Sequence, residues 1–259
     1  MPILRTILAA LLLPGLLLLA VTTTPAEAAR GGVHGRPSAD PGPTSAPSVN
    51  LEGIDVSEWQ GSIDWKRVAS DGKAFAIIRA SAGTLTADTT YAANRSGAVG
   101  AGIPMGAYHY ANPDHAPNDA INEANWFLSL AQPASGDLIP ALDVEVTNGL
   151  SVPEMQAWVG DWLQRVYDVT GVRAMIYTSP NFWATSMGDT HAFADAGYTV
   201  LWVAHWTSAS QPTVPAANWG GNSWTFWQYS SRGSVRGIKG NVDLDRYNGS
   251  SLAPTLFIP

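Results

Sequence analysis

Near its middle the chain reads Leu138-Ile139-Pro140-Ala141-Leu142-Asp143-Val144-Glu145-Val146, an apolar run that ends in two acids separated by one valine. Gly136 precedes the run, and Asn148 and Gly149 follow it. An apolar run of this length between turn-forming residues is typical of a strand buried on both faces, as in parallel sheets covered by helices. The segment therefore predicts such a sheet, with two carboxyl groups at the end of one strand.

The spacing of these two acids has a chemical consequence. Side chains alternate along a strand, so Asp143 and Glu145 are expected to point the same way, with Cα atoms about 6.5 Å apart. Two ionised carboxylates that close repel each other, which raises the pKa of one of them. A carboxyl that stays protonated near neutral pH can act as a general acid. An Asp-x-Glu by itself also fits a solvated strand end, so the rest of the chain must decide.

Composition and charge narrow the class of protein. The chain has 259 residues, no Cys, 11 Trp and a formal net charge of -7. An exported chain without cysteine has no disulfides, so its stability must come from packing. The acidic balance disfavours nucleic-acid binding, which requires a basic patch. The five His are scattered, and no metal-ligand cluster is recognisable. We therefore expect neither a metal nor an organic cofactor.

The first 50 residues are expected to lie outside the folded domain. Residues 1–28 fit a secretory signal, with Arg5, an apolar core and the cleavage site Ala26-Glu27-Ala28. A membrane anchor is the alternative, but the apolar run is short and a small-residue cleavage site follows it. Residues 29–50 are rich in Pro, Gly, Ser and Ala and predict a disordered linker. Residues 51–259 would form one domain, secreted and free of the membrane after cleavage.

Eight strand patterns follow one another in this domain. They cover residues 53–57, 75–79, 104–110, 138–146, 172–177, 200–204, 224–229 and 242–245. Helical patterns follow the first five, whereas Gly-, Ser- and Pro-rich loops join the last three. This order predicts an α/β fold, a TIM-like β/α barrel with about five β/α units and three final strands lacking regular helices. An open doubly wound sheet is the alternative, disfavoured because no Gly-rich dinucleotide fingerprint or P-loop is present.

Barrels of this type build their active sites at the C-terminal ends of the strands. The acids expected there are Asp55, Asp143, Glu145 and Asp243. Candidates for substrate binding at the same ends are Tyr108, Tyr177, Trp206 and Gln228. Acids and aromatic rings together suit a sugar cleft, because carboxylates act on glycosidic bonds and aromatic rings stack on pyranose faces.

Each candidate also has a purely structural interpretation. Asp55 could cap a helix, and Asp243 or Asp245 could form a turn. The aromatic rings could belong to the core. His109 points away from Tyr108 in a strand and is expected to be a hydrogen-bonded core residue rather than a catalytic one.

Seven short blocks, in order along the domain, resemble the glycoside hydrolase family 25 lysozymes. They are Gly53–Gln60, Ala107–Tyr110, Leu142–Glu145, Ile176–Thr178, Leu201–Trp206, Trp227–Ser230 and Val242–Asp245. The resemblance implies a β/α barrel and N-acetylmuramidase activity, the hydrolysis of the β-1,4 bond between N-acetylmuramic acid and N-acetylglucosamine in peptidoglycan. The chain departs from the family at Tyr110, where Phe is common, and at Asp245, where Asn is common.

The resemblance also implies roles for the four acids. Glu145 matches the proton donor, Asp143 its partner, and Asp55 and Asp243 the further acids of the cleft. In our hypothesis an ionised Asp143 holds the proton of Glu145 and orients the substrate's 2-acetamido group. In one version of the mechanism this group attacks C1. In the other version Asp243 or Asp55 activates the water that attacks C1. The expected partner is a peptidoglycan glycan strand, bound by a monomer. A chitinase-like hexosaminidase and a non-catalytic glycan-binding barrel remain the alternatives.

Overall fold

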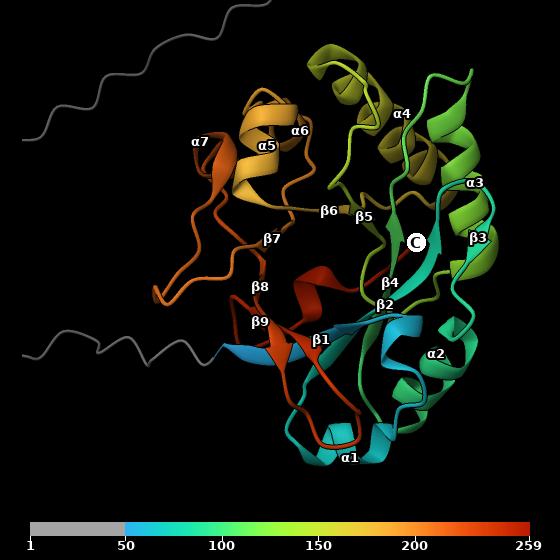
Figure 1. The fold of residues 1–259 in the computed structure, drawn as a ribbon, viewed down its shortest axis with the longest axis vertical. Helices are drawn as coiled ribbons and strands as arrows, with labels where there is room; N and C mark the ends of the chain where they lie inside the picture. The colour runs from blue at the N-terminus through green and yellow to red at the C-terminus, as the bar shows by residue number, and fades with distance from the viewer. Residues whose placement is uncertain (1–49) are drawn as a thin grey trace, which may run out of the picture. The chain divides into compact units, whose positions relative to one another are not determined.

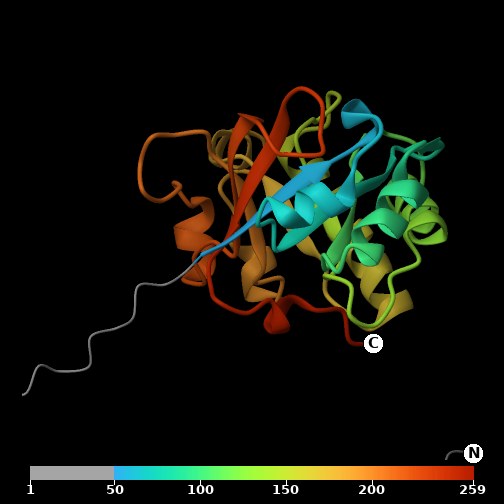
Figure 2. The same cartoon turned by 90° about the horizontal axis from the view of Figure 1, so that it is seen from below.

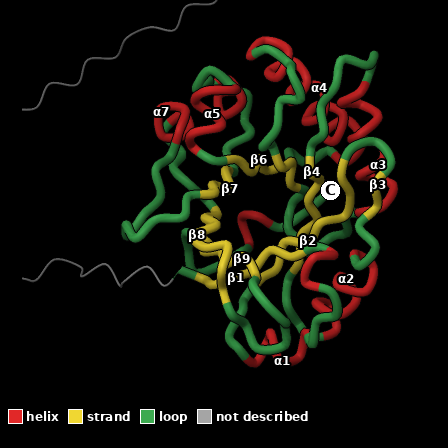
Figure 3. The backbone as a smooth tube through the Cα atoms, in the orientation of Figure 1, coloured by secondary structure: helices red, strands yellow, loops and turns green. Residues whose placement is uncertain are grey.

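Eight strands form a closed ring in the computed structural model, which describes residues 50–259 (Figures 1 and 3). Around the ring these strands are β1 (Leu51–Val56), β2 (Phe75–Ala82), β4 (Met105–Tyr110), β5 (Ala141–Asp143), β6 (Met175–Thr178), β7 (Leu201–Ala204), β8 (Phe226–Gly233) and β9 (Val242–Tyr247). The short β3 (Thr86–Ala87) pairs with β2 outside the ring. Pairing of β1 with both β2 and β9 closes the barrel, as predicted. The predicted signal peptide and all but the last residue of the predicted linker lie outside the described residues.

One strand of the ring runs against the others. Neighbouring strands from β1 through β8 are parallel, whereas β9 is antiparallel to β8 and to β1. Only the loop 234–241 joins β8 to β9. A parallel crossover needs a dozen or more residues, so a loop of this length returns the chain as a hairpin. The start of β9 therefore lies at the same end of the barrel as the C-terminal ends of the other strands, and we call this end the mouth.

Helices cover the outside of the barrel between successive strands. They are α1 (Trp65–Ser70), α2 (Tyr91–Gly100), α3 (Asp119–Ala131), α4 (Val152–Thr170), α5 (Pro180–Ser186), α6 (Ala192–Asp195) and α7 (Pro215–Gly220), with 3-10 turns η1 (Glu58–Gln60) and η2 (Ala253–Thr255). The longest, α4, begins with a capping box between Ser151 and Glu154 and ends at Gly171, which is in the left-handed conformation. None of the helices within residues 50–259 is long and apolar enough to cross a bilayer.

The strand predicted over residues 138–146 is shorter than expected. Regular β5 has only the residues Ala141 to Asp143. Pro140 has no N–H and cannot donate to the neighbouring strand, which explains where β5 begins. Before it, Leu138 pairs instead with Leu256 of the C-terminal segment, which crosses the barrel end opposite the mouth (Figure 2). After it, the Val144 N–H still donates to a β6 carbonyl at 2.9 Å, so the chain leaves the sheet just before Glu145.

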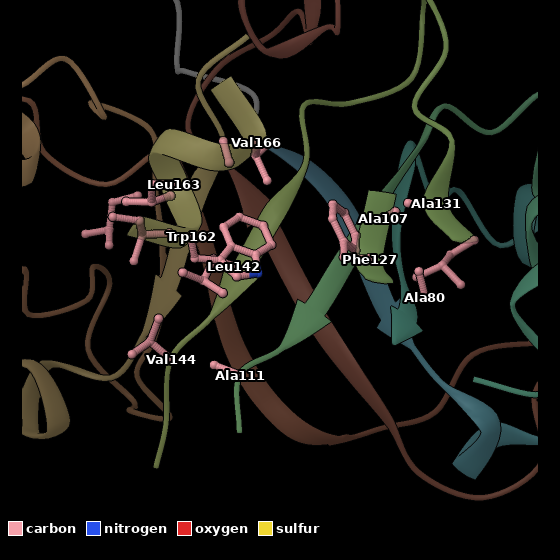
Figure 4. Packing of buried hydrophobic residues seen from close by; sticks show 14 of the residues in the cluster. Ala80, Ala107, Ala111, Phe127, Ala131, Leu142, Val144, Trp162, Leu163 and Val166 are labelled. Carbon is pink, nitrogen blue, oxygen red and sulfur yellow. The ribbon is translucent and has the colours of Figure 1, made fainter. Parts of the chain in front are cut away.

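The core has two layers, one on each face of the barrel wall. Outward-facing strand residues pack against α3 and α4, as Figure 4 shows for Leu142, Val144, Phe127 and Trp162. Inward-facing residues fill the barrel and include Phe75, Ile77, Trp202, Phe226 and Tyr247. The inner layer is tight: a Cβ on Gly53 would lie 2.4 Å from the ring of Phe75. Large aromatic rings thus supply the packing that a cysteine-free chain needs.

The short helix α7, between β7 and β8, is left-handed. Ala216, Ala217, Asn218 and Trp219 all have φ between 51 and 59°. Each non-glycine residue in this conformation costs about 1–2 kcal/mol, so the surroundings must hold it. The Asp189 carboxylate accepts from Ala216 N–H at 2.7 Å, and the buried Trp219 donates to a carbonyl at 2.9 Å. The segment between β7 and β8, where no regular helix was predicted, thus contains this short left-handed turn of helix.

This geometry reverses the usual effect of glycine in a helix. The exposed Ala217→Gly is expected to raise the free energy of unfolding by about 0.5–1 kcal/mol, because relief of the left-handed strain exceeds the added entropy of the unfolded chain. The matched change in the right-handed α4, Ala157→Gly, should lower it by about 1 kcal/mol. Urea unfolding of both variants measures the difference, and a lower stability for Ala217→Gly would contradict the assignment.

Candidate active site

The four predicted acids meet at the mouth of the barrel. Asp55 lies near the end of β1 and stands opposite Asp243 in the β1–β9 register. Asp143 is the last residue of β5, and Glu145 follows two residues later. The acids are close enough to change one another's pKa. In addition to burial, which is the main cause, Glu145 raises the pKa of Asp143 and of Asp243, and Asp243 raises the pKa of Asp55. Asp243 reaches the mouth because β9 is reversed, not because a strand ends there.

Asp143 and Glu145 both have a raised pKa, although Asp143 is buried and Glu145 is exposed at the cleft. Desolvation raises the pKa of Asp143 well above its ordinary value, the charge of Glu145 adds to this, and Arg79 partly opposes it. Oδ1 of Asp143 is buried and receives no hydrogen bond from the part of the chain that is described, so its charged form would be poorly solvated. The pKa of Glu145 is also raised by partial burial of its carboxyl, and the nearby Tyr177 hydroxyl opposes this rise. Burial and the charge of Glu145 thus both act against the ionised form of Asp143, and the ionised Asp143 of our hypothesis stays a prediction.

Gln228 connects three of the predicted residues in one hydrogen-bond chain. Its Oε1 accepts from Tyr177 Oη and from Trp206 Nε1, each at 3.0 Å. Its Nε2 donates to Oδ2 of Asp55 at 2.8 Å. The two donors on Oε1 and the carboxylate on Nε2 fix the orientation of the amide. Gln228 therefore holds Asp55 in place and links it to the rim of the mouth.

The predicted aromatic residues occupy two different places. Trp206 is 62% exposed at the rim, where a ligand can reach its ring. Tyr108 and Tyr177 are almost completely buried and pack on Trp202, with ring centroids 5.9 and 4.4 Å away. These two tyrosines form the floor beneath the acids rather than a stacking wall. The sequence analysis predicted that all three residues lie at the mouth. It did not predict that Trp206 lies at the rim and the two tyrosines at the floor.

A cleft of about 620 Å³ opens beside the acids. It begins at Glu145 and continues over the start of α5 to the loop after β7. Its lining residues are Glu145, Ser179, Pro180, Asn181, Phe182, Ala204, His205, Trp206 and Thr213. A volume of this size accommodates a small chain of sugars, and Phe182 and Trp206 supply aromatic surface. Glu145 is therefore the acid that stands directly at the cleft.

Two charged residues near the acids were not among the predicted site residues. Arg79, the cation that lowers the pKa of Asp143, is held by Asp88 and Glu58, each at 2.9 Å. Its position at the end of the predicted strand 75–79 was a usable signal, because a charged residue in a buried strand is expected to have a charged partner. Asp245 is completely buried and accepts from Trp202 Nε1 at 2.8 Å. Over residues 50–259, no group of three or more His, Cys, Asp or Glu could hold a metal ion.

Comparisons with known proteins agree on one family. The model of the glycosyl hydrolases family 25 matches residues 54–238. Lysozyme M1 of Streptomyces globisporus is 40% identical over 215 residues, covering 80% of this chain and 70% of that protein. The N,O-diacetylmuramidase of Chalaropsis sp is 31% identical over 209 residues, covering 74% of this chain and 96% of that protein.

Solved structures give the same result for the fold. The bacterial lysozyme from Streptomyces coelicolor superposes with a TM-score of 0.72 at 39% identity, covering 79% of this chain and 94% of that one. A family GH25 lysozyme from Aspergillus fumigatus superposes with a TM-score of 0.71 at 30% identity, covering 80% and 97%. The matches cover most of the described part of the chain.

Proposed function

Because this chain belongs to glycosyl hydrolase family 25 and is a glycoside hydrolase of the muramidase type, we propose that it cleaves the β-1,4 bond between N-acetylmuramic acid and N-acetylglucosamine in peptidoglycan, with Glu145 as the general acid. One observation carries the proposal. Glu145, its pKa raised by burial, stands at the start of a 620 Å³ cleft with an exposed tryptophan on its rim. A protonated carboxyl beside a sugar-sized cleft is the arrangement that glycoside hydrolysis requires.

In the proposed reaction Glu145 donates its proton to the glycosidic oxygen as the bond to C1 breaks. The aglycone leaves as an alcohol, and positive charge develops at C1 and the ring oxygen. Asp143 lies next to Glu145 and orients the 2-acetamido group, whose carbonyl oxygen attacks C1 to give an oxazolinium ion. Water then adds at C1 and returns a proton to Glu145. In the alternative, Asp243 or Asp55 deprotonates a water that attacks C1 directly.

The other site residues have supporting roles in this proposal. Trp206 stacks on a pyranose ring at the rim, because its ring is exposed and its Nε1 is anchored by Gln228 at 3.0 Å. Tyr177 donates to Gln228 and also lies within hydrogen-bonding reach of Glu145. Once Glu145 has lost its proton, the Tyr177 hydroxyl can turn to the new carboxylate and stabilise it.

The test is an analysis of products. Purified peptidoglycan treated with the protein should give soluble fragments whose new reducing end is N-acetylmuramic acid, measured by borohydride reduction and mass spectrometry. Chitin should give none. A new N-acetylglucosamine reducing end, or release from chitin, would support the chitinase-like hexosaminidase instead. Binding to walls without new reducing ends would support the non-catalytic glycan-binding barrel.

Export belongs to the same proposal, because peptidoglycan lies outside the plasma membrane. The pattern of residues 1–28 supports a cleaved secretory signal. Mass analysis of the protein recovered from culture medium should give a mature chain that begins at Ala29. Recovery of the protein only from cells, with Met1 retained, would contradict export.

A further inference from the structure

A second buried carboxyl lies beneath Asp55. Asp245 is 0% exposed and stands two residues beyond Asp243 on β9, one layer deeper in the barrel, opposite Gly53 and Gln228. Trp202 Nε1 donates to its Oδ1 at 2.8 Å. Its Oδ2 is also buried but receives no N–H or O–H donor from residues 50–259. The carboxyl of Asp55 is close enough for Asp55 and Asp245 each to change the pKa of the other.

The ionisation of both Asp55 and Asp245 is energetically unfavourable in this buried site. Mutual repulsion and lost hydration would both oppose it, and an orphaned buried oxygen adds a further penalty. One proton between the two groups removes both problems, because it halves the charge and gives the orphaned oxygen a partner. Gln228 donates to Asp55 on one side and Trp202 donates to Asp245 on the other, so each end of the pair already has its donor.

We propose that Asp245 is a positioning residue of the active centre, which holds one proton in common with Asp55 and thereby fixes Asp55 against Gln228. The proposal rests on the proposed function, in which Asp55 belongs to the substrate cleft. Asp245 extends the hydrogen-bond chain from the rim to the interior of the barrel. In this chain Trp206 and Tyr177 contact Gln228, Gln228 contacts Asp55, and Asp55 contacts Asp245. Loss of the shared proton would break this chain at its buried end and release Asp55 from its position.

Burial and the charge of Asp243 favour retention of the proton that Asp55 and Asp245 share, up to neutral pH. Burial is the main cause that raises the pKa of Asp245 to about 7, with Asp243 of the same strand adding to it and Lys73, before β2, opposing it. Burial and the charges of Asp245 and Asp243 raise the pKa of Asp55 well above its ordinary value. Tyr108 of β4 and Tyr177 of β6 also face Asp55, and its charge raises the pKa of both phenols. The pair is therefore expected to hold its shared proton below neutral pH and to lose it as the pH rises through about 7.

Asp245→Asn tests the proposal, because asparagine keeps the shape and can donate to Asp55 but cannot share a titrating proton. At acidic pH its kcat/KM on peptidoglycan should stay close to the wild-type value. On the alkaline side, the kcat/KM of the wild type should fall with the loss of two protons, one from Glu145 and one from the pair of Asp55 and Asp245. The kcat/KM of the variant should fall with the loss of one proton only, that of Glu145. Parallel profiles would overturn the proposal.

Two readouts do not depend on activity. Infrared titration of the unliganded protein should show, in the difference between wild type and Asp245→Asn, the carbonyl stretch of one neutral carboxylic acid that disappears near neutral pH; the bands of Asp143 and Glu145 cancel in that difference. A raised folded-state pKa gives stability at low pH that is lost as the pH rises through that pKa. The wild-type urea midpoint should therefore fall more than the variant's between about pH 4 and about pH 7, that is, between the ordinary pKa and the raised pKa of Asp245. If activity is absent but these results hold, only the proposed function fails.

Asp119→Asn is the matched control. Asp119 is another buried acid that accepts from a tryptophan Nε1, that of Trp158 at 2.8 Å, but it lies between α3 and α4 outside the barrel. Its variant should keep the wild-type pH profile. Should Asp245→Asn fail to fold, Trp202→Phe removes the donor that stabilises the Asp245 anion and should move the pair's titration to higher pH. An unmoved titration in that variant would overturn the proposal.

Discussion

Glu145→Gln is expected to lower kcat on peptidoglycan by about 10³-fold, within the range of 10²–10⁴ that general acid catalysis contributes. Glutamine matches the shape of glutamate but has no proton that it can give to a leaving oxygen. The side chain of Glu145 stands at the edge of the cleft and not in the packed core, so folding should not change. The measurement is the rate of new reducing ends from purified peptidoglycan, with circular dichroism and urea unfolding as the check on the fold.

A substrate with a better leaving group makes this prediction sharper. An aryl glycoside whose phenol leaves without protonation needs no general acid for that step. Its rate should fall much less in Glu145→Gln than the rate on peptidoglycan does. Equal losses on both substrates would indicate that Glu145 acts through its charge or by binding, and not by donating a proton.

Glu58→Gln is the control for simple removal of a charge near the mouth. Glu58 accepts from Arg79 at 2.9 Å, and glutamine can accept the same bond through its carbonyl oxygen. The variant should retain activity within about threefold of wild type, the effect typical of a surface substitution. A Glu145→Gln enzyme that keeps more than about a tenth of the wild-type kcat would remove Glu145 from the role of general acid.

The barrel could be predicted because its strands obey local rules. Apolar runs between turn residues located the strands, and their alternation with helical patterns indicated a closed β/α fold. The errors have local causes as well. Pro140 shortened β5, and the direction of β9 depended on the length of the loop before it. The left-handed α7 could not be predicted from the sequence, because alanine does not favour the left-handed conformation. Tertiary contacts impose this conformation on α7.

The site was predictable to the extent that strand ends determine it. Asp55, Asp143 and Glu145 are at the mouth because the parallel strands end there, and Asp243 because its strand begins there. Depth within the barrel was not predictable. Whether Asp245 lies in a surface turn or under Asp55 depends on the stagger between β9 and its neighbours, which pairing across the barrel sets.

A second buried network lies on the outer face of the barrel wall. His109 of β4 is in the core, as expected, with Nδ1 2.8 Å from Ser81 Oγ and Nε2 2.7 Å from Glu123 Oε2. Ser, His and Glu in this order resemble a nucleophile with its base and orienting acid. All three are at most 1% exposed, so no substrate reaches the serine. The arrangement instead ties β2 and β4 to α3, and its effect should be on stability.

Glu123→Ala is expected to lower the free energy of unfolding by about 3–5 kcal/mol, the cost of breaking a buried pair by removal of one partner. Glu123 Oε2 also accepts from the N–H of Asn112 at 3.1 Å, so its loss leaves the buried His109 ring without this partner and removes a second, part-buried bond. Urea unfolding measures the change. Glu123→Gln keeps an acceptor and should lose about 1 kcal/mol, whereas the exposed Asp161→Ala on α4 should stay within about 0.5 kcal/mol of wild type. A loss in Glu123→Ala no larger than in Asp161→Ala would mean that the network contributes nothing, and a loss of activity in the folded Glu123→Ala protein would mean that it reaches the mouth.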